Sequence, residues 1–207
     1  MRVLITGFGP FPGAPFNPSA ALAKALARRR RPAFAALDRT IHVFATTYAS
    51  VDRELPKLFA QKSDIVLMFG VAGRRLQLCV ETRARNAISL LFPDASGYRP
   101  QRPIIKIGGP AELTGNSPFA ALAGAARAST APSRLSRDAG RYLCNYAYWR
   151  ALERVRDGAP LVQFVHIPPV SQNPRPLRRG KRRAPSLAQL LNGAEAVLIA
   201  LVAASRH

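Results

Sequence analysis

The sequence contains only two cysteines, Cys79 and Cys144, among its 207 residues. Two cysteines do not make a disulfide scaffold, and they fit the reducing environment of the cytoplasm. They are also too few for a structural zinc site. We therefore expect a cytoplasmic protein that uses neither disulfides nor a bound metal for its stability.

Long apolar runs are also absent. No stretch of 18 or more apolar residues occurs, so we expect no helix that spans a membrane. The first seven residues are too short for a signal sequence and are expected to begin the fold as a strand. With 48% hydrophobic residues, no internal repeat and no long linker, residues 1–207 are expected to form one domain with a substantial core.

Acidic residues are scarce, with 11 Asp and Glu against 31 Lys and Arg, a formal net charge of +20. Such a charge favours non-specific contact with nucleic acid, and a non-enzymatic basic protein that binds through segments 28–31 and 175–183 is one alternative function. No aromatic platform or recognition motif accompanies the charge, so neither a specific nucleic acid nor a membrane is an expected partner. The four arginines of residues 28–31 end a predicted helix, where cations complement the helix dipole, which favours a solvated helix end.

Strand-like and helix-like segments alternate along the chain with short turns between them. Strands are expected at residues 2–6, 39–46, 64–70, 77–86, 104–107 and 161–165. Helices are expected at residues 20–27, 51–61, 117–128, 146–157 and 187–204, the last capped by Ser186. This order predicts a single-domain α/β layered fold with a mostly parallel, twisted central sheet and helices on both faces. In such folds, sites lie at the carboxyl ends of strands.

The first predicted strand ends in a glycine-rich loop, residues 7–13. A strand, a glycine-rich loop and a helix also open dinucleotide-binding sites. Here the spacing G-x-G-x-x-x-G is wrong, and Pro10 lacks an N–H that a phosphate would use. The loop could instead form a small apolar pocket walled by Phe8 and Phe11, and a packed turn explains either ring taken alone.

Cys144 lies between a cluster of turn-forming residues and the helix predicted over residues 146–157. It is therefore expected at or near the start of a helix, where free N–H groups and the positive end of the dipole stabilise a thiolate. A nucleophilic thiol is one hypothesis for this position. A free cysteine that fills a gap in the core is the other.

Two further residues have chemistry that suits a thiol. His166 follows the predicted strand 161–165 and precedes a proline turn, which is a suitable place for a catalytic base, although a lone histidine is more often structural. Glu81 lies near the middle of the predicted strand 77–86, where strand alternation places it on one face with Cys79, Arg83 and Arg85. It could orient a histidine or form an ordinary ion pair with Arg83.

Together these segments resemble the pyroglutamyl peptidase I family, also called pyrrolidone-carboxylate peptidases, a family of cysteine peptidases. The resemblance covers most of the chain and lies in four stretches that occur in the family's order. They are residues 6–11 with 17–19, residues 70–86 around Glu81, residues 136–145 (S-x-D-A-G-x-Y-L-C-N), and residues 165–168 (V-H-I-P). The cysteine stretch is long and specific, and the other three are weaker taken alone.

The resemblance implies Cys144 as nucleophile, His166 as its base and Glu81 as the group that orients His166. It implies hydrolysis of the N-terminal pyroglutamyl residue from small peptides through a thioester acyl-enzyme, without a metal or other cofactor. It further implies a homo-oligomer, commonly a tetramer. The implied substrate-binding residues are Phe8 and Phe11, which would sandwich the lactam ring, Gly70 and Val71 near the lactam, and Phe92 and Leu143.

The chain departs from the family's pattern at several positions. Cys79 replaces a usual serine or threonine, and Leu91 replaces an arginine often found ten residues after the glutamate. Arg83 or Arg85 could substitute for that arginine. With Val71, these departures leave open a second enzymatic function, in which the same triad acts on another N-blocked or cyclic amide.

Overall fold

The protein is described by a computed structural model that covers residues 1–11, 15–170 and 185–206. The strands are β1 (Arg2–Phe8), β2 (Asp38–Phe44), β3 (Ile65–Val71), β4 (Leu78–Glu81), β5 (Arg83–Arg85), β6 (Glu112–Thr114), β7 (Ser133–Ser136) and β8 (Leu161–Ile167). The helices are α1 (Pro18–Arg28), α2 (Tyr48–Phe59), α3 (Phe119–Ala128), α4 (Leu143–Leu152) and α5 (Leu187–Ala204), with a 3-10 turn, η1 (Pro32–Phe34). The basic segment 175–183 lies outside the described residues.

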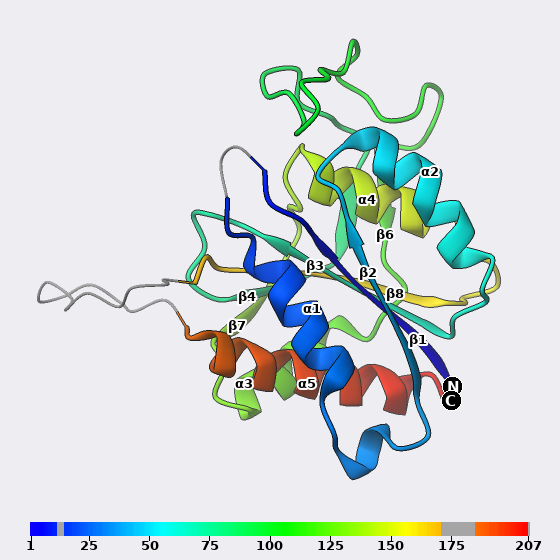
Figure 1. Ribbon diagram of the computed structural model, residues 1–207. Helices are drawn as coiled ribbons and strands as arrows, with labels where there is room; N and C mark the ends of the chain where they lie inside the picture. Colours follow the sequence, from blue (N-terminus) through cyan, green and yellow to red (C-terminus); the bar gives the residue numbers. More distant parts are fainter. Residues whose placement is uncertain (12–14, 171–184, 207) are drawn as a thin grey trace, which may run out of the picture.

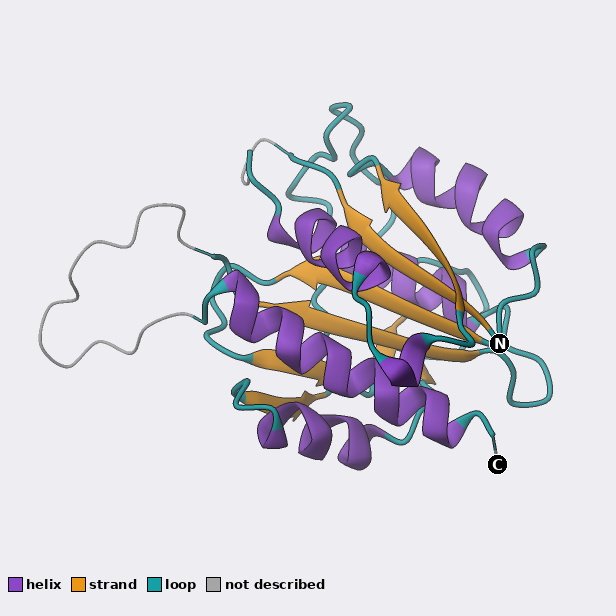
Figure 2. Cartoon of the chain, turned by 60° about the horizontal axis from the view of Figure 1, so that its bottom comes forward, coloured by secondary structure: helices purple, strands orange, loops and turns teal. Residues whose placement is uncertain are grey.

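The elements form three layers around one mixed sheet. Six strands pair in the order β2-β1-β3-β8-β4-β7, and the first four are mutually parallel. The β4–β8 contact is antiparallel and β4 pairs in parallel with β7. Helices α1, α3 and α5 cover one face, and α2 and α4 cover the other (Figures 1 and 2). The predicted single-domain α/β fold with a mostly parallel sheet is confirmed.

Strand alternation sorts the buried side chains onto the two faces of the sheet. Ile5, Leu67 and Val165 pack under α1, α3 and α5. Their strand neighbours Met68 and Phe164 pack under α2 and α4. The same alternation places four further residues on the α2 and α4 face: Phe8, Gly70, Glu81 and His166. Three of them are an even number of residues along their strand from a side chain buried on that face. Glu81 directly follows a side chain buried on the opposite face.

Helix α5 is the one helix of the described chain long and apolar enough to cross a membrane by length and composition. Leu190, Val197 and Leu201 on this helix are fully buried in the core against α1 and α3. Ser186 caps it as predicted, accepting from the Gln189 N–H at 3.2 Å while the Gln189 side chain accepts from the Ser186 N–H at 2.9 Å. Its hydropathy is thus explained by burial in the core.

The helix end predicted to be solvated is exposed at Arg28, Arg30 and Arg31, and two of its arginines also pair with a glutamate. Glu195 on α5 is 7% exposed and accepts from Arg29 Nε at 2.8 Å and Arg31 Nε at 2.5 Å. These pairs tie the segment after α1 to α5. The prediction missed them because a buried glutamate 164 residues away has no local sequence signal.

The predicted strand 77–86 is in fact two strands in different sheets. The Thr82 N–H donates to the Ser136 carbonyl at 2.7 Å, which completes the β4–β7 pairing. The next three residues, β5, then pair with β6 in a separate two-stranded sheet. The prediction that Arg83 and Arg85 share a face with Glu81 is therefore wrong. Arg83 pairs with Glu112 instead.

The strand predicted over residues 104–107 is also wrong. The N–H groups of Ile105 and Lys106 both donate to the Asn86 side-chain oxygen, at 2.9 and 2.8 Å. This amide replaces a neighbouring strand as the hydrogen-bond partner, so the segment stays a loop. Ile107 is 66% exposed, which shows that its apolar character does not reflect core burial.

Candidate active site

Three neighbouring strands, β3, β8 and β4, place the predicted site residues together. His166 is the register partner of Gly70 on β3 and of Cys79 on β4. Glu81 lies two residues beyond Cys79 on the same face, which makes it a diagonal neighbour of His166. The His166 Nδ1 lies 2.8 Å from Glu81 Oε1, and both side chains are buried.

Cys144 lies in the first turn of α4 and faces this pair from the side of the sheet that α2 and α4 cover. A Cβ atom placed on Gly70 would lie 2.6 Å from the Cys144 Sγ, so the thiol occupies the space that a side chain at this position would fill. Neighbouring strands are about 5 Å apart. The thiol above Gly70 therefore lies beside the His166 imidazole.

The start of α4 is fixed by hydrogen bonds to β5. The buried Asn145 side chain accepts from the Arg85 N–H at 2.8 Å and donates to the Arg85 and Ala87 carbonyls at 2.9 Å. The first backbone bond of the helix runs from the Tyr146 N–H to the Tyr142 carbonyl, at 3.0 Å. The N–H of Cys144 precedes that bond and has no acceptor within the helix, so the predicted location of this residue at a helix start is confirmed.

Glu81 is held ionised by its partners. Burial raises the pKa of its carboxyl, but hydrogen bonds and nearby charge outweigh burial and hold this pKa below its usual value. The main contributions are the hydrogen bond and charge of His166, followed by Ser136 and the positive charge of Arg75. Arg75 Nη1 donates to the same oxygen, Oε1, at 2.7 Å.

Sequence reasoning missed Arg75 and the role of Asn145. Arg75 lies in the loop between β3 and β4, and a loop arginine six residues before a glutamate carries no periodic signal. Asn145 was part of the motif around Cys144, but a buried amide that bridges to β5 could not be foreseen because β5 itself was not predicted.

His166 is tuned towards its charged form. Burial lowers the pKa of the imidazole. The charge of Cys144, the hydrogen bond to Cys144, and the hydrogen bond and charge of Glu81 outweigh burial and raise this pKa from 6.5 to about 9. Since Nδ1 faces Glu81, Nε2 is the ring nitrogen left for the thiol. A thiol, an imidazole and a carboxylate in this order can perform nucleophilic acyl transfer.

The residues expected to bind substrate lie in different environments. Phe8 is buried and packs against Phe44 with ring centroids 5.8 Å apart, and Leu143 is buried as well. Phe11 is half-buried with its ring 6.5 Å from that of Tyr142, and Val71 is half-buried. Gly70 lies against the Cys144 thiol. The structure places Phe92 on a loop with 63% exposure.

Arg83 and Arg85 could have replaced the family arginine that is Leu91 in this chain, but both have other partners. Arg83 pairs with Glu112, and Arg85 Nη2 lies 3.6 Å from Asp138 Oδ1. Leu91 itself is 74% exposed.

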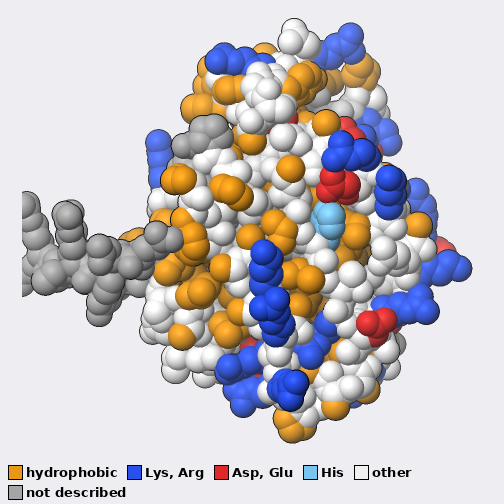
Figure 3. All heavy atoms as spheres, in the orientation of Figure 1, with side chains coloured by type: hydrophobic (Ala, Val, Ile, Leu, Met, Phe, Trp, Pro, Cys, Tyr) orange, Lys and Arg blue, Asp and Glu red, His pale blue; other side chains and the backbone are white. Residues whose placement is uncertain are grey.

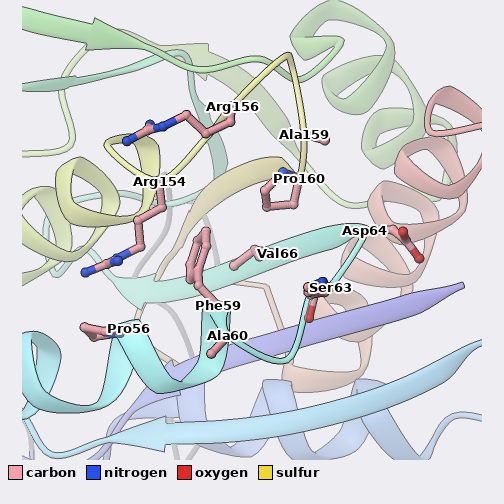
Figure 4. A pocket seen from close by; sticks show the side chains of 11 residues that line it. Pro56, Phe59, Ala60, Ser63, Asp64, Val66, Arg154, Arg156, Ala159 and Pro160 are labelled. Carbon is pink, nitrogen blue, oxygen red and sulfur yellow. The ribbon is translucent and has the colours of Figure 1, made fainter.

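A cavity of about 560 Å³ lies at the opposite end of the central strands, near the start of β3 and β8. Figure 4 shows Phe59 and Val66 between Arg154 and Pro160 in this cavity. It lies at the amino ends of the strands, whereas Cys144, His166 and Glu81 gather at the other end. It is therefore separate from the candidate active site.

Replacing Gly70 with alanine is expected to lower kcat by about 10-fold or more and to cost about 1–3 kcal/mol of unfolding free energy. The new methyl group would meet Cys144 Sγ at 2.6 Å and the Phe164 ring at 2.8 Å, so the thiol and the ring must both move. Gly73→Ala is the matched control, because a Cβ there meets nothing within 4 Å. Steady-state kinetics and thermal unfolding check this prediction. Equal values for the two variants would contradict it.

Comparison with known proteins agrees with this geometry. The sequence model of the pyroglutamyl peptidase family matches residues 1–207. The pyrrolidone-carboxylate peptidase of Gloeobacter violaceus is 31% identical over 200 residues, which cover 96% of this chain and 95% of that protein. The same-named protein of Thermococcus kodakarensis is 33% identical over 171 residues, 81% of each chain.

Solved structures show the same arrangement of elements. The pyrrolidone carboxyl peptidase of Thermus thermophilus superposes with a TM-score of 0.83 at 28% identity, over 96% of this chain and 99% of that one. The enzyme from Fervidobacterium islandicum superposes with a TM-score of 0.86 at 25% identity, over 98% and 99%. The family match spans both the sheet and the helix that bring a cysteine, a histidine and a glutamate together, and this chain belongs to the pyroglutamyl peptidase family.

Proposed function

We propose that the protein removes an N-terminal pyroglutamyl residue from peptides, with Cys144 as nucleophile, His166 as general base and acid, and Glu81 as the orienting carboxylate. The observation that carries the proposal is the placement of the Cys144 thiol above Gly70, beside an imidazole whose other nitrogen is 2.8 Å from a buried carboxylate. Family membership supports the same activity.

The reaction follows from these positions. His166 Nε2 takes the thiol proton, and the thiolate attacks the carbonyl carbon of the pyroglutamyl peptide bond. The tetrahedral intermediate collapses when the imidazolium gives that proton to the leaving amine, which leaves a thioester on Cys144. A water molecule then attacks the thioester while His166 accepts its proton. The proton returns to the sulfur, and free pyroglutamate is released.

The first turn of α4 is proposed as the oxyanion site. The N–H groups of Leu143, Cys144 and Asn145 precede the first helical hydrogen bond and lie at the positive end of the dipole. One such donor is typically worth about 3–4 kcal/mol of transition-state stabilisation. This assignment needs no side chain at position 91, where leucine offers no donor.

The pyroglutamyl ring is a small neutral lactam without a free α-amine. A pocket for it needs apolar walls and a few amide partners, and we assign Phe8, Phe11, Gly70, Val71, Phe92 and Leu143 to its walls and rim. Initial rates on pyroglutamyl, prolyl and N-acetyl amides with one leaving group test the assignment. A clear preference for the pyroglutamyl amide is expected. Faster cleavage of another N-blocked amide would favour the alternative substrate class for the same triad.

The loop between β5 and β6 supports a homo-oligomer, with a tetramer as our proposal. Leu91, Phe92 and Ile107 on this loop are 74%, 63% and 66% exposed, which is costly for apolar side chains that face only water. Light scattering on the purified protein tests this, and a monomer at micromolar concentration would contradict it. Both cysteines are free, which supports a cytoplasmic location.

Segment 175–183 lies outside the described residues, and among the described residues nothing favours the nucleic-acid alternative. Arg29 and Arg31 of the other segment pair with Glu195. Figure 3 shows Lys and Arg side chains distributed across this face of the molecule with apolar and neutral side chains between them, rather than gathered into one groove.

A further inference from the structure

Arg75 makes a set of hydrogen bonds that the proposed mechanism does not yet use. Its side chain is 19% exposed, and its Nη1 donates to Glu81 Oε1 at 2.7 Å and to Ser136 Oγ at 3.0 Å. Its Nη2 donates to the Asp138 carbonyl at 2.5 Å. One guanidinium therefore bridges β4, which carries Glu81, to the segment that leads into α4 and Cys144.

The hydrogen bonds on Glu81 are concentrated on one of its two oxygens. Arg75 and His166 both bind Oε1, while the buried Oε2 has no hydrogen-bond partner among the described residues. A buried carboxylate is costly unless it is paired. Without Arg75, His166 would be the one side chain within hydrogen-bond distance of the carboxylate among the described residues, and the carboxylate could present either oxygen to the imidazole.

The planar fork of an arginine suits this task better than a point charge. Two of its nitrogens have separate, fixed acceptors on Glu81 and Asp138, so the guanidinium cannot follow a rotation of the Glu81 carboxylate without losing its bond to Asp138. The Ser136 hydroxyl gives the guanidinium a third contact and helps to fix its plane.

We propose that Arg75 is a positioning residue for catalysis: it holds Glu81 ionised, with Oε1 directed at His166 Nδ1, and links this pair to the segment that carries Cys144. The inference rests on the proposed function of the triad and adds a fourth side chain to it. Arg75 acts through Glu81 and does not touch the substrate.

The test compares Arg75→Met and Arg75→Lys with the wild-type protein on a pyroglutamyl amide. Arg75→Met is expected to lower kcat by about 10- to 100-fold, as for other groups that orient a catalytic ligand, with KM within about twofold. Because Arg75 helps to hold the Glu81 pKa down, its loss in Arg75→Met should move the acid limb of kcat/KM to higher pH. Arg75→Lys keeps the charge but loses the fork. It should restore the acid limb and only part of kcat.

Arg83→Met is the matched control. Arg83 is 21% exposed, pairs with a glutamate, and donates from Nε to the Arg137 carbonyl at 2.9 Å, so it holds the same segment without touching Glu81 or His166. Its kcat and acid limb are expected to match the wild type. If Arg75→Met and Arg83→Met change kcat, the acid limb and the thermal midpoint equally, Arg75 has a structural role only and the inference is overturned.

A readout that needs no substrate separates this inference from the proposed function. The rate of Cys144 alkylation by iodoacetamide is measured against pH in both variants, since the other cysteine, Cys79, is fully buried. The acid midpoint of alkylation should rise in Arg75→Met and stay in place in Arg83→Met. An unchanged midpoint in Arg75→Met would overturn the inference. An inactive wild type that still shows the shift would overturn only the proposed activity.

Discussion

Replacing Cys144 with serine is expected to lower kcat/KM for a pyroglutamyl amide by about 10³-fold or more. The thiol has the position of a nucleophile, in the first turn of α4, over Gly70 and beside His166. Serine has nearly the same shape, so the fold should be preserved, but its hydroxyl is a much weaker nucleophile beside the same base. Steady-state kinetics and acyl-enzyme trapping with mass spectrometry measure the loss.

Cys79→Ser is the control for this experiment. Cys79 is fully buried and is the register partner of His166 on β4, so it lies close to the site without reaching the thiol's place above Gly70. Its replacement is expected to keep activity within about threefold, although the buried hydroxyl can cost about 1–3 kcal/mol of stability. Activity that survives in Cys144→Ser and disappears in Cys79→Ser would reverse the assignment of the nucleophile.

The arrangement of the sheet explains why much of the site could be predicted. Cys79 and Glu81 were expected on one face of a strand, with Leu78 and Val80 on the other. The structure confirms the second pair, because Leu78 and Val80 pack together under α5. Alternation is a property of the strand itself, so it needs no knowledge of the neighbours. The start of α4 near Cys144 was predictable for the same reason, since turn and helix signals are local.

The parts that could not be predicted depend on which segments are neighbours in space. The placement of β8 between β3 and β4 brings His166 opposite Gly70 and Cys79, and no local pattern specifies that order. The break at Thr82 was missed because its backbone bond goes to Ser136, 54 residues later. Arg75 was missed for the same reason, since two of its three partners, Ser136 and Asp138, lie more than 60 residues away.

Replacing Glu81 with glutamine is expected to lower kcat by about 10²- to 10⁴-fold. The amide oxygen can still accept from His166 Nδ1 and from Arg75, while the NH₂ group takes the place of Oε2, which has no partner among the described residues. The substitution therefore removes the charge and keeps the shape. Glu112→Gln is the matched control, because Glu112 pairs with Arg83 and is remote from the hydrogen bonds of His166. Its activity should equal that of the wild type.

The pH dependence of Glu81→Gln gives the more specific result. The His166 pKa is raised from 6.5 to about 9, so its contribution to folding stability is fully present below pH 6.5 and is lost as the pH rises through about 9. The alkaline limb of kcat/KM should likewise lie near pH 9 in the wild type. Glutamine removes the charge of Glu81, one of the causes that raise this pKa, so both the alkaline limb and the alkaline loss of thermal stability should move to lower pH. A limb that stays at pH 9 in Glu81→Gln would show that Glu81 does not support the imidazolium, and the role of this carboxylate would have to be reassigned.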